Sequence, residues 1–178
     1  MAPTNPNTNA NDIDYTTGGW AKTVIDRPPQ VVFDTLTDVP NWPNINKGVT
    51  ISVTPKDAKV EVGAQFCETI QAPVEGMGRW SNTWTVQELI QGKKFVMTAM
   101  DNFSSIPIPS RLTYTFTAVE GSNGSKTTFF RSIDTAPTQE FWDKAKPEEK
   151  EALYRFQGSQ SEMAAHLKQY VEQNTPAS

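Results

Sequence analysis

The hydrophobic residues of this 178-residue chain follow two different periods in two consecutive regions. Between Gly48 and Asp134 apolar and polar residues alternate, which is the pattern of half-buried β-strands. After Pro137 the apolar residues recur every three or four positions, which is the pattern of an amphipathic helix. Turn signals separate the alternating runs, and short links between successive strands favour an antiparallel meander. The sequence therefore predicts an α+β domain.

The alternating region predicts six strands, at about 49–54, 63–71, 79–88, 93–101, 110–119 and 126–134. An additional strand is expected over 17–26, followed by two short helices. The first begins at Asp26-Arg-Pro-Pro, where we expect the carboxylate to cap the helix and the prolines to occupy its first turn. The second begins at Asp38-Val-Pro-Asn-Trp-Pro, and its Trp42 is expected to plug one end of the fold.

The last region predicts a short helix over 140–144 and a long helix over 147–173. Pro147 and the two glutamates after it suit a first turn, because proline needs no helical partner there and carboxylates favour the positive end of the helix dipole. One apolar stripe runs along this helix. Gly158 and Ser159 interrupt the stripe, and they are expected either to bend the helix or to open space beneath it.

The chain length suits one domain. We expect residues 1–16 to be disordered or loosely attached, residues 17–173 to form the domain and 174–178 to be a tail. The N-terminal segment lacks the apolar core of a signal peptide, and no later segment is long enough to span a bilayer. These features predict a cytoplasmic protein without stable membrane insertion. The sequence leaves the oligomeric state open.

Charge and composition argue against several function classes. The formal net charge is −4 and the basic residues are scattered, so the concentrated basic face of a nucleic-acid-binding protein is not expected. The chain has one cysteine, Cys67, and one histidine, His166. Cysteine and histidine zinc sites use three or four ligands, so we expect no metal and no other cofactor.

Several short motifs occur in an order that resembles the START-like (SRPBCC) superfamily. They are Arg27-Pro-Pro-Gln-Val-Val-Phe33, Asp38-Val-Pro-Asn-Trp42-Pro, Val62-Gly63-Ala-Gln-Phe66, Trp84-Thr-Val86-Gln-Glu88 with Gly92-Lys-Lys-Phe95, and Gly124-Ser-Lys-Thr127-Thr128. The resemblance covers roughly 17–173. It implies a helix-grip fold, in which a curved seven-stranded antiparallel sheet wraps around a long C-terminal helix, with two short helices between strands 1 and 2. Members of this superfamily include polyketide cyclases and dehydratases, lipid-transfer domains and pollen-allergen-like binders, and they share no universal catalytic motif.

Strand alternation predicts which side chains face the helix. If Val86 points inward, so do the residues two, four and six positions before it, and the same logic applies to the neighbouring strands. The last strand offers two sets, Phe129/Arg131/Ile133 or Phe130/Ser132/Asp134, and we favour the first. The predicted binding residues on this face are Phe66, Trp80, Asn82, Trp84, Met97, Tyr114, Phe116 and Phe129, joined by Phe156, Met163 and His166 from the helix.

Glu68 and Arg131 are the charged residues of this mostly apolar face. A buried charge is costly unless it has partners. Either the two form a structural ion pair or lie at the open end of the cavity, or they orient a ligand and act as the catalytic residues. His166 flanks the apolar stripe of the helix, so it is either a solvent-edge or core residue or an acid–base group.

Two functions remain open. One is an enzyme that binds a mostly apolar, oxygenated small molecule in an internal cavity and catalyses its cyclisation, dehydration or isomerisation. The alternative is a non-catalytic carrier for a lipid or hydrophobic metabolite. The mixed polar set inside the expected cavity favours the enzyme. A protein-interaction module has little support in the sequence.

Overall fold

The computed structural model describes residues 13–176, so most of the predicted N-terminal segment and the last two residues of the predicted tail lie outside the described residues. A seven-stranded antiparallel sheet in the order β1-β7-β6-β5-β4-β3-β2 forms one layer. The strands are β1 (Thr17–Ile25), β2 (Thr50–Thr54), β3 (Gln65–Gln71), β4 (Arg79–Ile90), β5 (Lys94–Asp101), β6 (Ile108–Ala118) and β7 (Thr127–Thr135). The predicted strands are confirmed, with ends that differ by one or two residues.

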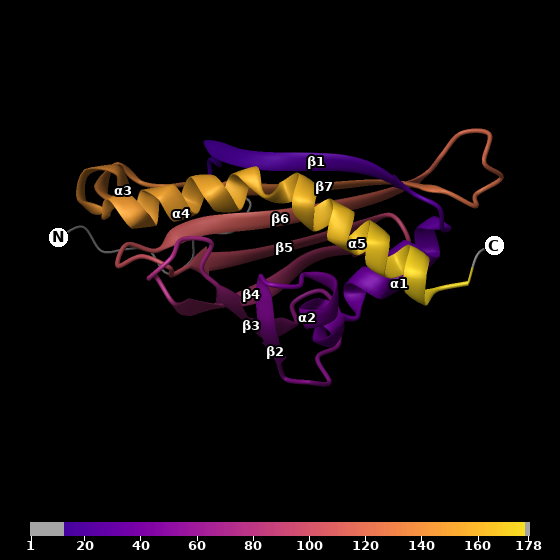
Figure 1. Ribbon diagram of the computed structural model, residues 1–178, viewed down its shortest axis with the longest axis horizontal. Helices are drawn as coiled ribbons and strands as arrows, with labels where there is room; N and C mark the ends of the chain where they lie inside the picture. Colours follow the sequence, from indigo (N-terminus) through magenta and orange to yellow (C-terminus); the bar gives the residue numbers. More distant parts are fainter. Residues whose placement is uncertain (1–12, 177–178) are drawn as a thin grey trace.

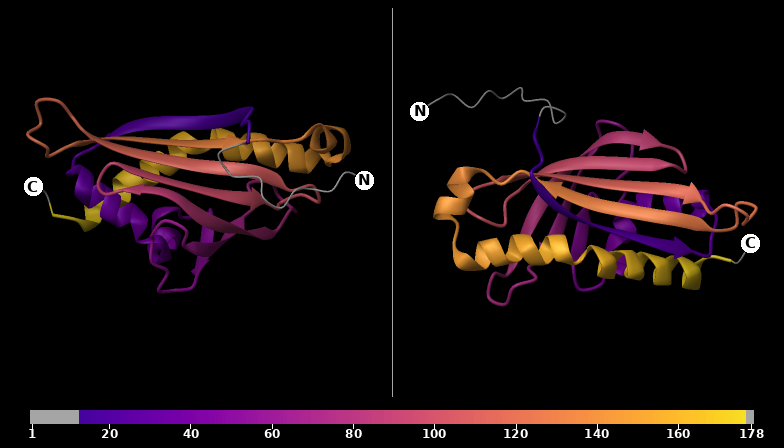
Figure 2. Two further views of the ribbon diagram at one scale, coloured as in Figure 1. Left: turned by 180° about the vertical axis from the view of Figure 1, so that it is seen from behind. Right: turned by 90° about the horizontal axis from the view of Figure 1, so that it is seen from above.

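Helices cover the inner face of this sheet. Between β1 and β2 lie α1 (Pro29–Thr37), a 3-10 turn (Val39–Asn41) and α2 (Trp42–Ile45), and after β7 come α3 (Gln139–Lys144), α4 (Pro147–Gly158) and α5 (Gln160–Asn174). Figure 1 shows α4 and α5 running end to end along the sheet, with α1 and α2 beside the C-terminal half of α5. The side view in Figure 2 places α4 and α5 on one face of the sheet only. The helix-grip fold is thus confirmed.

The predicted long helix is interrupted at Ser159. The hydroxyl of Ser159 donates to the Phe156 carbonyl at 2.9 Å, a local bond of the kind that competes with regular helix geometry. The chain of β1 also approaches here: a Cβ added to Gly19 would lie 2.0 Å from the backbone oxygen of Gln157. Glycine in β1 therefore lets the end of α4 pack directly on the sheet backbone.

One predicted cap is wrong. Asp26 does not cap α1, whose first flanking residue is Pro28 and which has no side-chain cap. The Asp26 carboxylate instead pairs with Lys126 at 2.7 Å, across the end of the sheet. The expected first turn of α4 is present, since Pro147 lies in it and the Lys146 backbone N–H donates to Glu149 at 2.8 Å.

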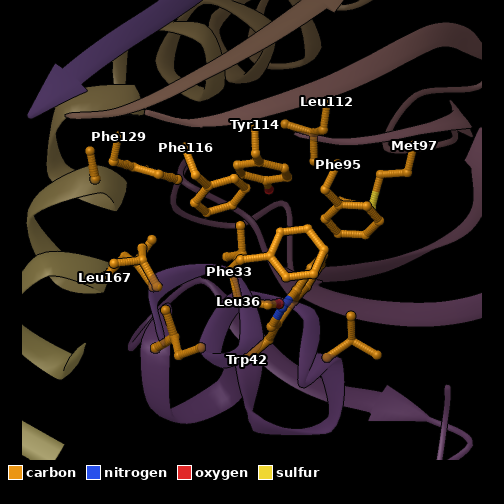
Figure 3. Close-up of a cluster of buried hydrophobic side chains, with 14 of the residues drawn as sticks. Phe33, Leu36, Trp42, Phe95, Met97, Leu112, Tyr114, Phe116, Phe129 and Leu167 are labelled. Atoms are coloured by element: carbon orange, nitrogen blue, oxygen red, sulfur yellow. The ribbon is translucent and has the colours of Figure 1, made fainter. Parts of the chain in front are cut away.

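The main core lies between the sheet, α1, α2 and α5. In Figure 3, Phe33, Leu36 and Trp42 from the helical segment point toward Phe95 and Phe116 on the strands. Phe33 meets Phe116 edge-on with ring centroids 5.4 Å apart, and Trp42 meets Phe66 in the same way at 5.4 Å. Trp42 is 1% exposed, so it closes this end of the fold as predicted. A second cluster under α3 and α4 is formed by Ile108, Phe141, Ala145 and Leu153.

Candidate functional site

A group of buried polar side chains lies on the inner face of the sheet, among the apolar residues of the core. We call it the interior polar cluster. It draws on six consecutive strands of the sheet and on the first turn of α5. Its members are Thr50, Glu68, Asn82, Asp101, Ser110, Tyr114, Arg131 and Gln160.

Glu68 is 5% exposed and accepts two hydrogen bonds. The Thr50 hydroxyl donates to one carboxylate oxygen at 2.5 Å, and the indole nitrogen of Trp84 donates to the other at 2.9 Å. Burial raises the pKa of Glu68, while these two hydrogen bonds and the charge of Arg131 act in the opposite direction. Glu68 is therefore a desolvated carboxyl group with a proton affinity above the ordinary one.

Asp101 is the second buried carboxyl group of the cluster, at 3% exposure. It accepts hydrogen bonds from the Asn82 amide and the Ser110 hydroxyl. Burial raises its pKa from 3.8 to about 7; the two hydrogen bonds lower it and the negative charge of Glu68 raises it. The sequence analysis missed this residue, although continuing the inward set Phe95, Met97 and Ala99 by one step along β5 reaches it.

Arg131 is 4% exposed, and its Nε donates to the Gln160 side-chain oxygen at 2.9 Å. Its guanidinium lies over the ring of Tyr114, 5.5 Å from the centroid. Within residues 13–176 no carboxylate lies within salt-bridge distance of Arg131, and its two terminal nitrogens have no hydrogen-bond partner. Burial lowers the pKa of Arg131, and burial raises the pKa of Tyr114 to about 12, so Tyr114 keeps its phenolic proton.

Glu68 and Arg131 therefore do not form the direct ion pair that the sequence left open. Both are buried, which also excludes exposure at an open end. Each carries its own hydrogen bonds, and the two interact at longer range through their charges. A buried guanidinium with unpaired donors can bind an oxygen atom of a ligand.

Most of the predicted apolar residues belong to one core. Those in the main core near α1, α2 and α5 are Phe66, Trp84, Met97, Phe116 and Phe129. Trp80 lies at the opposite end, half-buried, with its ring 5.6 Å from Phe103 and 6.4 Å from Phe156. Met163 on α5 is also buried.

His166 is placed away from the interior polar cluster. It lines a pocket of about 130 Å³ on the other side of α5, together with Asn44 and Lys47 of the α2 region. Its Nε2 lies 4.0 Å from Glu162 on the exposed side of the helix. His166 is half-buried, and its Nδ1 is buried without a hydrogen-bond partner among the described residues, so both alternatives for His166 stay predictions.

A pocket of about 470 Å³ lies at the end of the fold where α4 begins. It is lined by Met77 from the β3–β4 loop, by Phe103 from the β5–β6 loop and by Lys146 and Glu149 at the start of α4. Phe103 contacts Trp80, which is two positions from Asn82 on the same face of β4. The interior polar cluster lines neither this pocket nor the one beside His166, and the enclosed apolar pocket expected under the helix stays a prediction.

Within residues 13–176, no three His, Cys, Asp or Glu side chains are grouped closely enough to hold a metal ion. In the same part of the chain, no helix is long and apolar enough to cross a membrane.

Comparisons with known proteins agree with this architecture. The family described as "Polyketide cyclase / dehydrase and lipid transport" matches residues 21–172. No curated protein sequence matches the chain.

Similar solved structures include the Zhui aromatase/cyclase from Streptomyces sp. R1128, with 16% identity and a TM-score of 0.61, over 90% of this chain and 96% of that one. A START superfamily protein from Mycobacterium smegmatis has 11% identity and a TM-score of 0.62, over 89% and 99%. A protein from Thermus thermophilus has 14% identity and a TM-score of 0.62, over 90% and 100%. At these identities the likeness concerns the fold.

Proposed function

Because the chain belongs to the polyketide cyclase / dehydrase and lipid transport family, whose fold binds hydrophobic ligands, we propose that it binds a mostly apolar, oxygenated small molecule between sheet and helix and catalyses its cyclisation, dehydration or isomerisation. The observation that carries this proposal is the interior polar cluster. A carrier of purely apolar ligands would not need two buried carboxyl groups and a buried guanidinium, since each is costly to desolvate.

The three proposed reactions share one step, the removal of a proton from a carbon next to a carbonyl group. Arg131 would hold the carbonyl oxygen and stabilise the negative charge that develops on it, because its terminal nitrogens stay charged donors. Tyr114 lies beneath the guanidinium and supports its position. Glu68, with a raised pKa, would accept the carbon-bound proton.

We place the entry of the ligand at the pocket at the start of α4. A molecule entering past Met77 and Phe103 would first reach Trp80, whose ring lies 5.6 Å from that of Phe103. Behind Trp80 on the same face of β4 lie Asn82 and then Trp84, which donates to Glu68. Apolar rings would thus line the entrance and the polar cluster would receive the oxygenated end of the ligand.

The test uses 4-phenylbutan-2-one, an apolar ketone, in deuterated water. Proton NMR of the ketone should show exchange of the protons next to the carbonyl, catalysed by the wild-type protein. Glu68→Gln should bind the ketone but lose the exchange, and Arg131→Met should lose both affinity and exchange. Asp134→Asn is the matched control, because Asp134 pairs with Arg111 on the outer face of the sheet.

The family description also includes lipid transport, so a carrier is the second candidate. Binding of the ketone without any exchange would favour the carrier over the enzyme. Unchanged binding and exchange in both the Glu68 and Arg131 variants would remove these residues from the site, whatever their effect on the melting temperature.

A further inference from the structure

The three nitrogens of the Arg131 guanidinium have different surroundings. Nε donates to the side-chain oxygen of Gln160 at 2.9 Å, and the guanidinium carbon lies over the ring of Tyr114, 5.5 Å from the centroid. The two terminal nitrogens have no hydrogen-bond partner within residues 13–176. The guanidinium is thus held through Nε and covered on one face, while the fork of its two terminal nitrogens stays unbound.

Gln160 is itself held by the interruption between α4 and α5. It is 1% exposed, and its side-chain nitrogen donates to the Phe156 carbonyl oxygen at 2.8 Å. The hydroxyl of Ser159 donates to the same oxygen. Because the amide nitrogen faces this carbonyl, the amide oxygen is the end that faces Arg131. The orientation of the Gln160 side chain is therefore fixed by hydrogen bonds at both of its ends.

The direct partner of Arg131 is neutral, although buried arginines are normally paired with acids. Within residues 13–176 no carboxylate lies within salt-bridge distance of Arg131. The oxygens of Glu68 accept from Thr50 and Trp84 instead. Glu68 acts on Arg131 through its charge at longer range, which compensates the guanidinium in part. Gln160 thus orients the guanidinium without neutralising it.

We propose that Gln160 is a positioning residue that determines which ligand charge the site accepts, because it leaves the oriented guanidinium fork of Arg131 free for an anionic group. The ligand class is an apolar molecule that ends in a carboxylate, since a carboxylate matches this fork with two parallel charge-assisted hydrogen bonds. The inference rests on the proposed function in one respect, that the ligand reaches Arg131. A ketone offers the fork one neutral oxygen, which becomes negative only when a proton leaves the neighbouring carbon.

The experiment compares two compounds of nearly the same shape. In 3-phenylpropanoate a carboxylate oxygen replaces the terminal methyl group of 4-phenylbutan-2-one, so the two differ in charge and hardly in size. Ligand-observed NMR titrations measure the dissociation constant of each. Wild type should bind the carboxylate at least about tenfold more tightly than the ketone, because hydrogen bonds between two ionised groups are stronger than those to a neutral carbonyl.

Gln160→Glu should abolish this preference. The new carboxylate would pair with Arg131 and repel a second carboxylate there, so 3-phenylpropanoate should bind at least about 100-fold more weakly. The uncharged ketone should lose no more than about tenfold. The matched control is Gln157→Glu, which places the same charge at the other buried glutamine of the junction. Because Gln157 bonds to Thr17 and Thr135, this control should keep the wild-type preference.

A second variant covers the case in which Gln160→Glu folds poorly, since its carboxylate would face the Phe156 carbonyl. Gln160→Met removes the oxygen that orients Arg131 and adds no charge. It should weaken the binding of 3-phenylpropanoate by at least about fivefold, because the guanidinium loses its orienting hydrogen bond. Unchanged affinity in Gln160→Met, or a preference for the carboxylate that survives in Gln160→Glu, would overturn the role of Gln160.

This inference and the proposed function can fail separately. Exchange of ketone protons by the wild type without tighter binding of 3-phenylpropanoate would overturn the inference and leave the proposed function intact. Tighter binding that Gln160→Glu abolishes, in a protein that exchanges no ketone protons, would support the inference and favour the carrier over the enzyme. Binding of neither compound would overturn both.

Discussion

Two tryptophans on the same face of β4 differ in one hydrogen bond. The indole nitrogen of Trp84 donates to Glu68, whereas the buried indole nitrogen of Trp80 has no partner within residues 13–176. The carboxylate of Glu68 depends on such donors because it is out of contact with water. Trp84 therefore stabilises the ionised form of the Glu68 carboxyl group and also packs in the core.

Trp80 and Trp84 allow a matched pair of substitutions. Trp84→Phe should lower the free energy of unfolding by about 1.5–3 kcal/mol, because it removes a hydrogen bond to a buried charged group. Trp80→Phe removes a donor that bonds to nothing and should cost less than about 1 kcal/mol. Urea unfolding of both variants measures the difference. Equal losses would mean that the Trp84 hydrogen bond contributes nothing to stability.

The pKa of Asp101 makes the stability of the protein depend on pH. In the folded protein its pKa is about 7 and its ordinary value is 3.8, so between these values the folded state binds more protons than the unfolded state. The free energy of unfolding should therefore fall as the pH rises through this range, by about 1.4 kcal/mol for each unit of pKa shift. Burial of Glu68 acts in the same direction.

Asp101→Asn should reduce this dependence, since the amide does not titrate. Urea unfolding at pH 5 and pH 8 checks the prediction: wild type should be the more stable at pH 5, and the variant should show a smaller difference. An equal change in the free energy of unfolding between pH 5 and pH 8 in both proteins would show that Asp101 is ionised throughout this range.

At the level of elements, the contact between β1 and the end of α4 places the helices over the sheet. Gly19 lies where any side chain would meet the backbone oxygen of Gln157, and the interruption at Ser159 follows immediately. The residue after the interruption, Gln160, holds Arg131. The position of the guanidinium is thus tied to this helix junction.

Two glycines at the junction give opposite predictions. Gly19→Ala should destabilise the protein by about 1–3 kcal/mol, because the backbone must move to admit the new Cβ. In Gly158→Ala the new Cβ meets nothing within 4 Å, and stability should rise by up to about 1 kcal/mol, since alanine favours helices. Thermal unfolding compares the two. A neutral Gly19→Ala would show that the junction is loosely packed.

At the level of the whole molecule, the residues of the interior polar cluster are buried, and the pocket beside Met77 and Phe103 lies at the end of the fold where α4 begins. The native ligand is expected to be apolar over most of its length and oxygenated at the end that reaches Arg131. Native mass spectrometry of protein purified from its source organism should detect such a molecule. Arg131→Met, purified in the same way, should retain less of it, and equal retention would place the ligand elsewhere.

The metal-free prediction also applies to the whole molecule. Elemental analysis of the purified protein should find no stoichiometric transition metal, because one cysteine and one histidine cannot supply a conventional site. One bound equivalent that is lost together with ketone exchange would contradict this prediction and indicate carboxylate ligands.

The sequence alone determined the elements and the face of each strand. Alternation is a local property, so the inward position of Glu68 and Arg131 followed from their neighbours along the chain. The one bulge within β4, between Val86 and Glu88, lies beyond Asn82 and Trp84 and therefore left their orientation unchanged. Local propensity likewise located the helix interruption near Gly158 and Ser159.

Only the tertiary structure decided which groups meet. Asp26 forms a salt bridge with Lys126 instead of capping the helix that follows it. His166 lies beside residues of the α2 region rather than facing the sheet. Glu68 and Arg131 share a face but not a salt bridge, because each finds nearer hydrogen-bond partners from strands or helices distant in sequence. The burial that raises the pKa of Asp101 likewise comes from the packing of the whole domain. The local alternation of apolar and polar residues does not specify how deeply a side chain is buried.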